Sequence, residues 1–236
     1  MQWINKIELN TLLKLSLLLF CSLFIPYIVL CFYAHPIADD YTYNTAYNFW
    51  LDQKTLYLHW NGRYTSNFLA MTNPILFNSF TGYRLAAFTL LLTMPISIGF
   101  MLSSTTGKAF SLLERSLISI ISSLFILSLL PSLAEGIYWY SGAVTYLLGC
   151  CVAMLYIAFM FLFLQKKYLI NRFIHIFLSG VLLFIAIGFN EVQMLLLVFA
   201  HITLWITVKK EERYRSVWLI MLLLCVIFSS FVFFFP

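Results

Sequence analysis

Two adjacent carboxylates, Asp39 and Asp40, directly follow the first long apolar stretch of the chain. Neighbouring carboxylates repel one another, and each requires water, a cation or a proton donor. The pair therefore indicates a site that handles charge, by accepting a proton or by binding a cation through its oxygen atoms. The alternative from these two residues alone is structural, because an Asp pair in a wet loop can simply cap the helix that follows.

The same loop continues with Trp60-Asn-Gly-Arg-Tyr64, which combines aromatic rings, an amide and the guanidinium of Arg63 around a glycine. The glycine permits a turn, and the mixture of side chains is typical of a binding wall that includes Trp60 and Tyr64. Trp and Tyr also gather at any membrane interface, so an aromatic belt is the alternative for each single ring.

A third group begins at Glu135 and contains the consecutive aromatic residues Tyr138, Trp139 and Tyr140. Flat aromatic faces beside an acid suit a sugar ring, which stacks through its C–H face while carboxylates and amides bind its hydroxyl groups. Glu191, in Gly188-Phe-Asn-Glu191, is an acid in another short connection. A glycine-containing bend with a hydrated acid is the alternative for both segments.

The composition identifies an integral membrane protein, because 62% of the residues are hydrophobic and only 10% are charged. Soluble domains have about 45–50% apolar and about 25% charged residues. We expect an all-α fold, a polytopic transmembrane helical bundle that forms a single membrane domain over residues 1–236. Its apolar stretches, each close to the roughly 20 residues of a membrane span, are 12–33, 83–102, 116–133, 143–164, 173–189, 192–208 and 217–235.

The bundle is thus expected to have about seven spans. The fifth and sixth stretches are short and separated by few residues, so a bent hairpin that does not fully cross is the alternative for that pair. The first stretch is longer than the apolar region of a signal peptide and is not followed by a small-residue cleavage site, which predicts an uncleaved anchor. The five cysteines lie in apolar stretches without metal-ligand spacing and are interpreted as packing residues.

Lysine and arginine predict the orientation, since short positively charged loops stay cytoplasmic. Alternating spans bring one group of basic residues to one side: Lys6, Lys14, Lys108, Arg115, Lys166, Lys167, Arg172, Lys209, Lys210, Arg213 and Arg215. The N-terminus is therefore predicted to be cytoplasmic, in a plasma or inner membrane. The net charge of +5 arises from these loops and gives no reason to expect a nucleic-acid partner.

The opposite, extracytoplasmic side receives the loop 34–82 and the connections 134–142 and 188–191. Each of them carries an acid, and the alternating topology allows these acids to face one aqueous cleft. Within the first loop, an amphipathic interfacial helix is predicted from Asp40, with one face formed by Tyr43, Ala46, Tyr47, Trp50 and Leu51. His35 and His59 are interpreted as structural.

The order of these motifs resembles polytopic bacterial glycosyltransferases of the GT-C type. The resemblance rests on Ala-Asp-Asp-Tyr and Trp60-Asn-Gly-Arg-Tyr64 in the first outer loop, then on Glu135-Gly-Ile-Tyr-Trp-Tyr-Ser-Gly and Gly188-Phe-Asn-Glu191. More narrowly, the chain resembles a branch of these enzymes that has paired Asp residues and a Gly-Arg-Tyr element. The resemblance covers about the first 195 residues. It implies a membrane protein that transfers a sugar from a polyprenyl-phosphate donor to an extracytoplasmic glycan or lipid acceptor.

The resemblance also implies roles for individual residues. Asp39 or Asp40 is expected to be the catalytic base, with the second carboxylate fixing the first or coordinating a divalent cation. Arg63 is expected to bind the departing phosphate, because a guanidinium offers paired donors to phosphate oxygens. A rim Arg that contacts lipid headgroups is its alternative.

Two other classes of function are compatible with the same residues. One is a transporter or flippase for a lipid-linked glycan, although the predicted spans contain few of the polar residues typical of transport cores. The other is a non-catalytic partner in a cell-surface glycan assembly complex. Enzymes of the resembled type usually have more spans, so the chain is expected to be a half-length member or only an N-terminal half.

Overall fold

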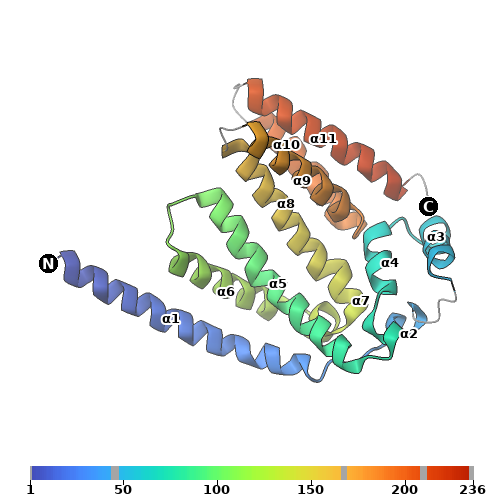
Figure 1. Cartoon of the computed structure of the whole chain (residues 1–236), viewed down its shortest axis with the longest axis horizontal. Helices are drawn as coiled ribbons and strands as arrows, with labels where there is room; N and C mark the ends of the chain where they lie inside the picture. Colours follow the sequence, from blue (N-terminus) through green and yellow to red (C-terminus); the bar gives the residue numbers. More distant parts are fainter. Residues whose placement is uncertain (1, 44–47, 166–168, 208–211, 234–236) are drawn as a thin grey trace.

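The computed structural model of the chain is helical throughout the residues it describes, which are 2–43, 48–165, 169–207 and 212–233. Long helices run back and forth through the molecule (Figure 1). A short turn joins α5 to α6 at one end, and longer connections lead from α1 to α5 and from α6 to α8 at the other. The long helices are α1 (Gln2–Cys31), α5 (Phe80–Thr106), α6 (Leu112–Leu129), α8 (Gly149–Gln165), α9 (Leu169–Ile187), α10 (Glu191–Thr207) and α11 (Glu212–Phe233).

Among the described residues, four helical segments are long and apolar enough to cross a membrane, which fits a membrane protein. They are Glu8–Cys31, Phe80–Thr106, Leu112–Leu129 and Tyr140–Gln165. The fifth to seventh predicted spans coincide with shorter apolar helices, Phe173–Ile187, Glu191–Ile206 and Ser216–Val232. The all-helical fold is therefore confirmed for the described residues, with four candidate membrane spans, while a crossing by the last three helices stays a prediction.

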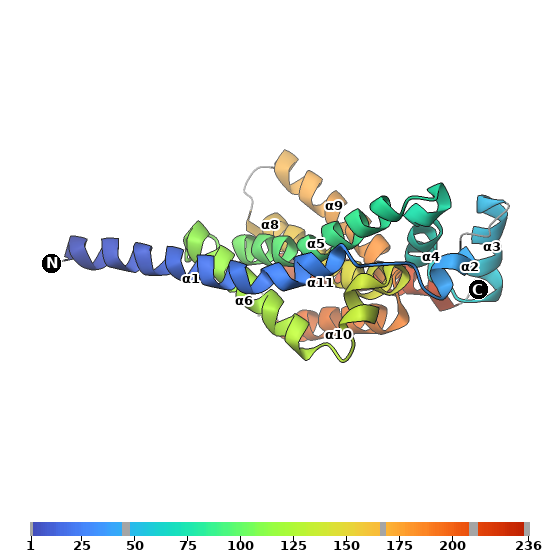
Figure 2. The same cartoon turned by 90° about the horizontal axis from the view of Figure 1, so that it is seen from below.

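The described helices pack around two clusters of buried apolar side chains. One cluster joins α1, α5 and α6 to the segment that precedes α8, and the other joins α8, α9, α10 and α11. Helix α8 contributes to both clusters and packs along α5 and α9, so it links the two groups of helices. Figure 2 shows α1 extending away from the remaining helices toward its N-terminus, where its apolar side chains are exposed.

The loop 34–82 forms short helices at one end of the bundle, as predicted in outline. They are α2 (Asp39–Tyr43), α3 (Phe49–His59), α4 (Tyr64–Met71) and the single 3-10 turn η1 (Pro74–Phe77). A continuous helix from Asp40 to Leu51 is wrong, because Asn48 has an extended backbone and begins a new helix. Its side chain accepts a hydrogen bond from the Leu51 N–H, while its own N–H donates to Asp52. Ala46 and Tyr47 lie outside the described residues.

The connection before α8 contains two wide helical turns of the π type. These are η2 (Ala134–Tyr138) and η3 (Ala143–Leu148), with the single turn α7 (Tyr140–Gly142) between them. Trp139 has an extended backbone and separates η2 from α7. Such π turns are rare and recur at functional sites, because each one redirects the side chains that follow it. Here they turn the segment 134–148 toward the short helices of the first loop.

Candidate functional site

The carboxylate of Asp40 is fully buried and is held by three different parts of the fold. Tyr83, in the first turns of α5, donates its hydroxyl to Oδ2 at 2.6 Å. Ser141 donates both its hydroxyl, at 2.6 Å, and its backbone N–H, at 3.1 Å, to Oδ1. The N–H of Ile37 donates to Oδ2 at 3.3 Å. Four donors therefore satisfy a carboxylate that has no access to solvent.

The hydroxyl of Tyr83 extends this network, since it also accepts a hydrogen bond of 2.9 Å from the N–H of Tyr140. Asp40 thus ties α2 to α5 and to the segment 134–148. This arrangement goes beyond a simple helix cap, because the donors come from residues 43 and 101 positions away in the sequence. The predicted charge-handling pair is split, with Asp40 turned into the protein and Asp39 exposed.

Asp39 lines a polar cavity of about 160 Å³ that lies between α2, α4 and the segment 134–148. Its wall is formed by one acid, one guanidinium, two amides, several hydroxyl groups and aromatic rings. The lining residues are Asp39, Tyr43, Trp60, Asn61, Arg63, Ser66, Asn67, Ala70, Trp139, Ser141, Gly142, Thr145 and Tyr146. Burial raises the pKa of the Tyr43 phenol, so Tyr43 stays neutral at physiological pH.

Arg63 meets Glu191 in a two-pronged ion pair beside this cavity. The Nε of Arg63 lies 2.8 Å from Oε1 and 3.0 Å from Oε2 of Glu191, and Nη2 lies 2.7 Å from Oε2. Both side chains are about one third exposed, at 30% and 34%. The hydrogen bonds to Glu191 are the main cause that raises the pKa of the Arg63 guanidinium, which therefore remains charged.

The segment that carries Arg63 is docked onto the turn between α9 and α10. The N–H groups of Thr65 and Ser66, at the start of α4, both donate to the carbonyl of Gly188, at 3.0 and 3.3 Å. The hydroxyl of Tyr64 donates to the carbonyl of Phe184 at 2.6 Å, and the two rings stack. Gly188 thus provides partners for N–H groups that a helix start leaves without intrahelical acceptors.

The side-chain amides of Asn61 and Asn67 form the part of the cavity wall next to Arg63. Oδ1 of Asn61 accepts hydrogen bonds from the Arg63 N–H, at 3.1 Å, and from Nδ2 of Asn67, at 2.9 Å. Asn67 is buried, whereas the indole of Trp60 is 77% exposed and forms part of the rim. The Trp-Asn-Gly-Arg-Tyr motif is therefore divided between a fixed polar wall and an exposed aromatic edge.

Not all of the predicted binding residues come together at this cavity. Glu135 is exposed and does not line it. Tyr140 donates its hydroxyl to the carbonyl of Leu69, and Tyr138 donates to the carbonyl of Tyr27 in α1, so both rings serve to join elements. Tyr64 is bound to α9 as described above. Of the predicted residues, Asp39, Trp60, Arg63 and Trp139 line the cavity, and Glu191 reaches it through Arg63.

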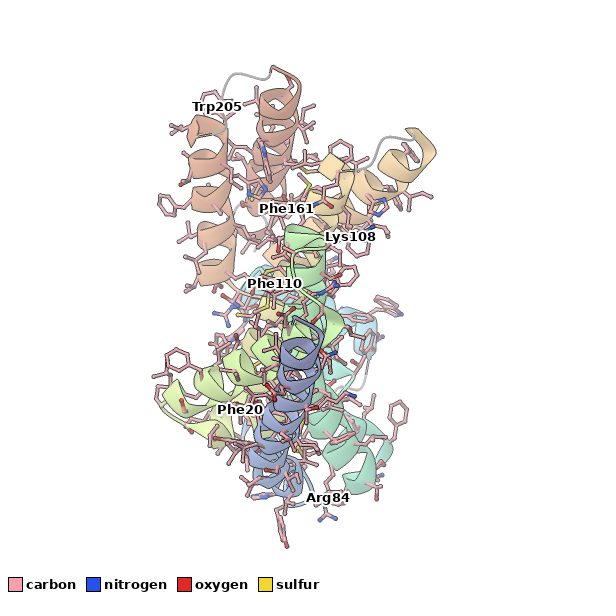
Figure 3. The ribbon with its side chains drawn as sticks, turned by 90° about the vertical axis from the view of Figure 1, so that its left-hand side faces the viewer. Phe20, Arg84, Lys108, Phe110, Phe161 and Trp205 are labelled. Carbon is pink, nitrogen blue, oxygen red and sulfur yellow. The ribbon has the colours of Figure 1, made fainter. Side chains whose placement is uncertain are left out.

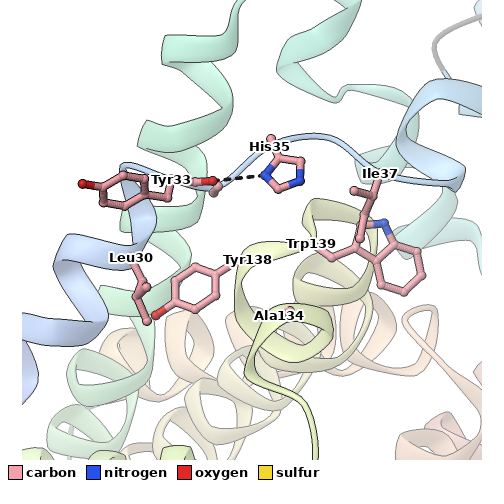
Figure 4. A pocket seen from close by; sticks show the side chains of 8 residues that line it. Leu30, Tyr33, His35, Ile37, Ala134, Tyr138 and Trp139 are labelled. Atoms are coloured by element: carbon pink, nitrogen blue, oxygen red, sulfur yellow. Dashed lines mark hydrogen bonds between the residues drawn. The ribbon is translucent and has the colours of Figure 1, made fainter.

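Trp139 stands between this cavity and a second, apolar pocket of about 180 Å³ at the end of α1 (Figure 4). Tyr33, Tyr138 and His35 contribute rings to the apolar pocket, and His35 interacts through Nδ1 with the carbonyl of Tyr33 at 3.1 Å. Within the part of the chain that the structure describes, the buried indole nitrogen of Trp139 has no hydrogen-bond partner. Trp139 thus carries a free donor next to the polar cavity.

Several residues of the site were not singled out from the sequence. Tyr83 lies in an apolar stretch that predicts a span, and Ser141 belongs to a motif whose aromatic residues and acid alone suggest binding. Asn61, Asn67 and Tyr146 also line the cavity. In the described ranges, no three His, Cys, Asp or Glu side chains are grouped as metal ligands would be, and the divalent cation stays a prediction.

Comparisons of the chain with protein-family models, with curated proteins and with solved structures found no match.

Proposed function

We propose that this chain is a membrane glycosyltransferase of the GT-C type, which transfers a sugar from a polyprenyl-phosphate donor to a glycan or lipid acceptor outside the cytoplasm. The observation that carries the proposal is the cavity beside α2 and α4, where a carboxylate, a guanidinium, amides and aromatic rings line one space at the end of apolar helices. A lipid-linked sugar requires both environments, the membrane for its polyprenyl chain and a polar cavity for its sugar and phosphate.

In the proposed reaction, an acceptor hydroxyl attacks the anomeric carbon of the sugar. A new bond forms between the acceptor oxygen and that carbon, while the bond from the carbon to the phosphate oxygen breaks and the phosphate leaves with the electron pair. Asp39 takes the proton of the hydroxyl, because it is the carboxylate that lines the cavity. Asp40 is a positioning residue, which fixes the start of α2 through Tyr83 and Ser141.

Arg63 stabilises the charge that develops on the departing phosphate. A guanidinium has five N–H donors in a rigid fork, and Glu191 occupies only the Nε and Nη2 side of it. The remaining donors are available to phosphate oxygens and to Tyr146, whose hydroxyl also interacts with Arg63. Glu191 therefore fixes the orientation of the guanidinium and leaves some of its N–H donors available to the phosphate.

The size of the cavity limits what it holds. Pockets that enclose drug-sized ligands measure about 300–1,000 Å³, whereas this cavity measures about 160 Å³. We therefore assign it the sugar and its phosphate, with the polyprenyl chain outside in the membrane. The same proposal sets the cavity on the extracytoplasmic side of a plasma or inner membrane, because Lys108 and Arg115 lie at the opposite end of α5 and α6.

The test is a transfer assay in membranes that contain the chain and a labelled polyprenyl-phosphate sugar. We expect Asp39→Asn to lower the transfer rate by at least about 100-fold, the usual contribution of a general base, with unchanged membrane insertion. Glu135→Gln is the matched control, because Glu135 is an exposed acid outside the cavity. It should retain the wild-type rate.

Full transfer by the Asp39→Asn variant would overturn the assignment of the base. Movement of the labelled lipid across the membrane without transfer by the wild-type chain would favour a transporter. A third outcome is that deletion of the chain removes a cell-surface glycan that both the Asp39→Asn and the Glu135→Gln variants then restore. That result would favour a non-catalytic partner in an assembly complex.

A further inference from the structure

A separate groove lies between α5 and α6, near the turn that joins them and far from the polar cavity. It has a volume of about 360 Å³. Figure 3 looks at this end of the molecule, with Lys108 and Phe110 of the turn near its centre. The groove is lined by Pro95, Ile96, Gly99, Ser103, Leu112, Arg115, Ser116, Ser119 and Ile120.

The groove has one charged end and one apolar end. Arg115 lies in the first turn of α6, and its Nη1 donates to the hydroxyl of Ser103 at 2.6 Å. Within the described ranges, no carboxylate lies within ion-pair distance of Arg115. Deeper along the helices the wall consists of Pro95, Ile96 and Ile120. An unpaired cation therefore stands at the mouth of an apolar channel.

Small side chains line this channel where α5 and α6 meet. A methyl group on Gly99 would lie only 3.0 Å from Oγ of Ser119, so the two helices are in close contact there. The Ser119 hydroxyl donates to the carbonyl of Arg115 at 2.6 Å, within its own helix. Its polar group is thus satisfied internally, and the wall that it forms is suitable for an apolar chain.

The length of the groove matches one leaflet of a bilayer. Pro95 and Ser103 are eight residues apart on α5, which corresponds to about 12 Å along a helix. Half of the hydrocarbon core of a bilayer is about 15 Å thick. With Arg115 at the level of the headgroups, the apolar part of the groove reaches close to the midplane.

We propose that this groove binds an anionic glycerophospholipid from the leaflet at this end of the bundle. The phosphate binds to Arg115, with the exposed Lys108 adding positive charge nearby, and one acyl chain lies along Ile96 and Ile120. A lipid fits better than a protein helix, because a single cation at a channel mouth complements one phosphate with an attached chain. The proposal is independent of the proposed transfer activity, since the groove lies at the other end of α5 and α6.

The test measures lipid binding to the purified full-length chain in detergent. Native mass spectrometry follows the retention of phosphatidylglycerol and of phosphatidylcholine with matched acyl chains. The wild-type chain should prefer the anionic lipid, and Arg115→Gln should weaken phosphatidylglycerol binding about fivefold, the effect of one basic residue at an anionic headgroup. Arg84→Gln is the control, because Arg84 is an exposed arginine near the start of α5, at the end of that helix away from the groove.

Two further variants separate charge from folding. Arg115→Lys keeps the charge and should retain the preference for phosphatidylglycerol. Ser116→Leu fills the groove and should lower the binding of both lipids, with helix content unchanged by circular dichroism. Equal binding of the two lipids by the wild-type chain would overturn the proposal, as would undiminished phosphatidylglycerol binding by both Arg115→Gln and Ser116→Leu.

Discussion

Arg63 and Glu191 lie 128 positions apart in the sequence, yet three contacts of 2.7 to 3.0 Å join the guanidinium to the carboxylate. This pair connects two motifs that are separate in the sequence, Trp60-Asn-Gly-Arg-Tyr64 and Gly188-Phe-Asn-Glu191. It also means that the turn between α9 and α10 reaches the end of the bundle where the first loop lies. If that loop is extracytoplasmic, the turn is extracytoplasmic as well, which agrees with a full crossing by α9 and α10.

Arg63→Lys should impair the use of the donor more than folding. A lysine keeps the charge but loses the two-pronged contact, which fixes the direction of the donors. We expect the KM for the polyprenyl-phosphate sugar to rise about tenfold, the equivalent of one lost charge-assisted hydrogen bond. Because both partners are about one third exposed, the loss of stability should stay below about 1 kcal/mol. Steady-state kinetics and thermal unfolding in detergent measure the two effects, and an unchanged KM would make Arg63 a purely structural residue.

Asp40→Asn should lower stability, unlike Asp39→Asn. An asparagine at position 40 turns an NH₂ group toward donors that currently point at a carboxylate, so a buried N–H or O–H loses its acceptor. We expect a cost of about 3 kcal/mol and reduced transfer as α2 loses its anchor. Thermal unfolding of the two variants in detergent distinguishes them, and equal midpoints would contradict the positioning role of Asp40.

Tyr83→Phe should have the same kind of effect as Asp40→Asn, though a weaker one. The missing hydroxyl removes a donor to Asp40 and an acceptor for the Tyr140 N–H. We expect a loss of about 1–3 kcal/mol for these unsatisfied groups. In a double-mutant cycle, the Asp40→Asn and Tyr83→Phe effects should be non-additive, because the residues share one hydrogen bond. Additive effects would show that the two residues stabilise the fold independently.

Gly188→Ala should disturb the docking of α4. A methyl group at this position would lie 2.3 Å from the ring of Tyr64 and 2.5 Å from the Thr65 hydroxyl, so α4 must shift. We expect both a lower unfolding midpoint and a higher KM for the polyprenyl-phosphate sugar, because Arg63 moves out of hydrogen-bonding position with Glu191. Gly180→Ala is the matched control in the same helical hairpin, because nothing lies within 4 Å of its added methyl group. It should be neutral or stabilising by up to about 1 kcal/mol.

The sequence predicted those features that depend on local properties. Apolar length predicted each long helix, and in the first loop Asp40 predicted the start of a helix and Gly62 a turn. The interruption at Asn48 was missed, since helical spacing of the aromatic residues continues across it. The capping ability of Asn48 and Asp52 was the signal that a new helix begins.

The tertiary partners could not be predicted in the same way. Asp40 is buried because Tyr83 and Ser141 supply donors from distant segments, and nothing in the Asp39-Asp40 pair indicates which of the two turns inward. The expected convergence of outer acids holds for Asp39 and, through Arg63, for Glu191. It does not hold for Glu135, which lies within the π turn η2 and is exposed, whereas Trp139 and Ser141, which follow that turn, line the cavity.

The orientation in the membrane can be tested with two exposed lysines at opposite ends of the bundle. Lys54 lies on α3 in the first loop, and Lys108 lies in the turn between α5 and α6. In intact cells, a membrane-impermeant thiol reagent should label Lys54→Cys but not Lys108→Cys, because basic turns stay cytoplasmic. After permeabilisation both variants should react, which controls for burial, and the unsubstituted chain gives the background from its native cysteines. Labelling of Lys108→Cys alone in intact cells would invert the topology and would place the polar cavity in the cytoplasm, where an extracytoplasmic acceptor cannot reach Asp39.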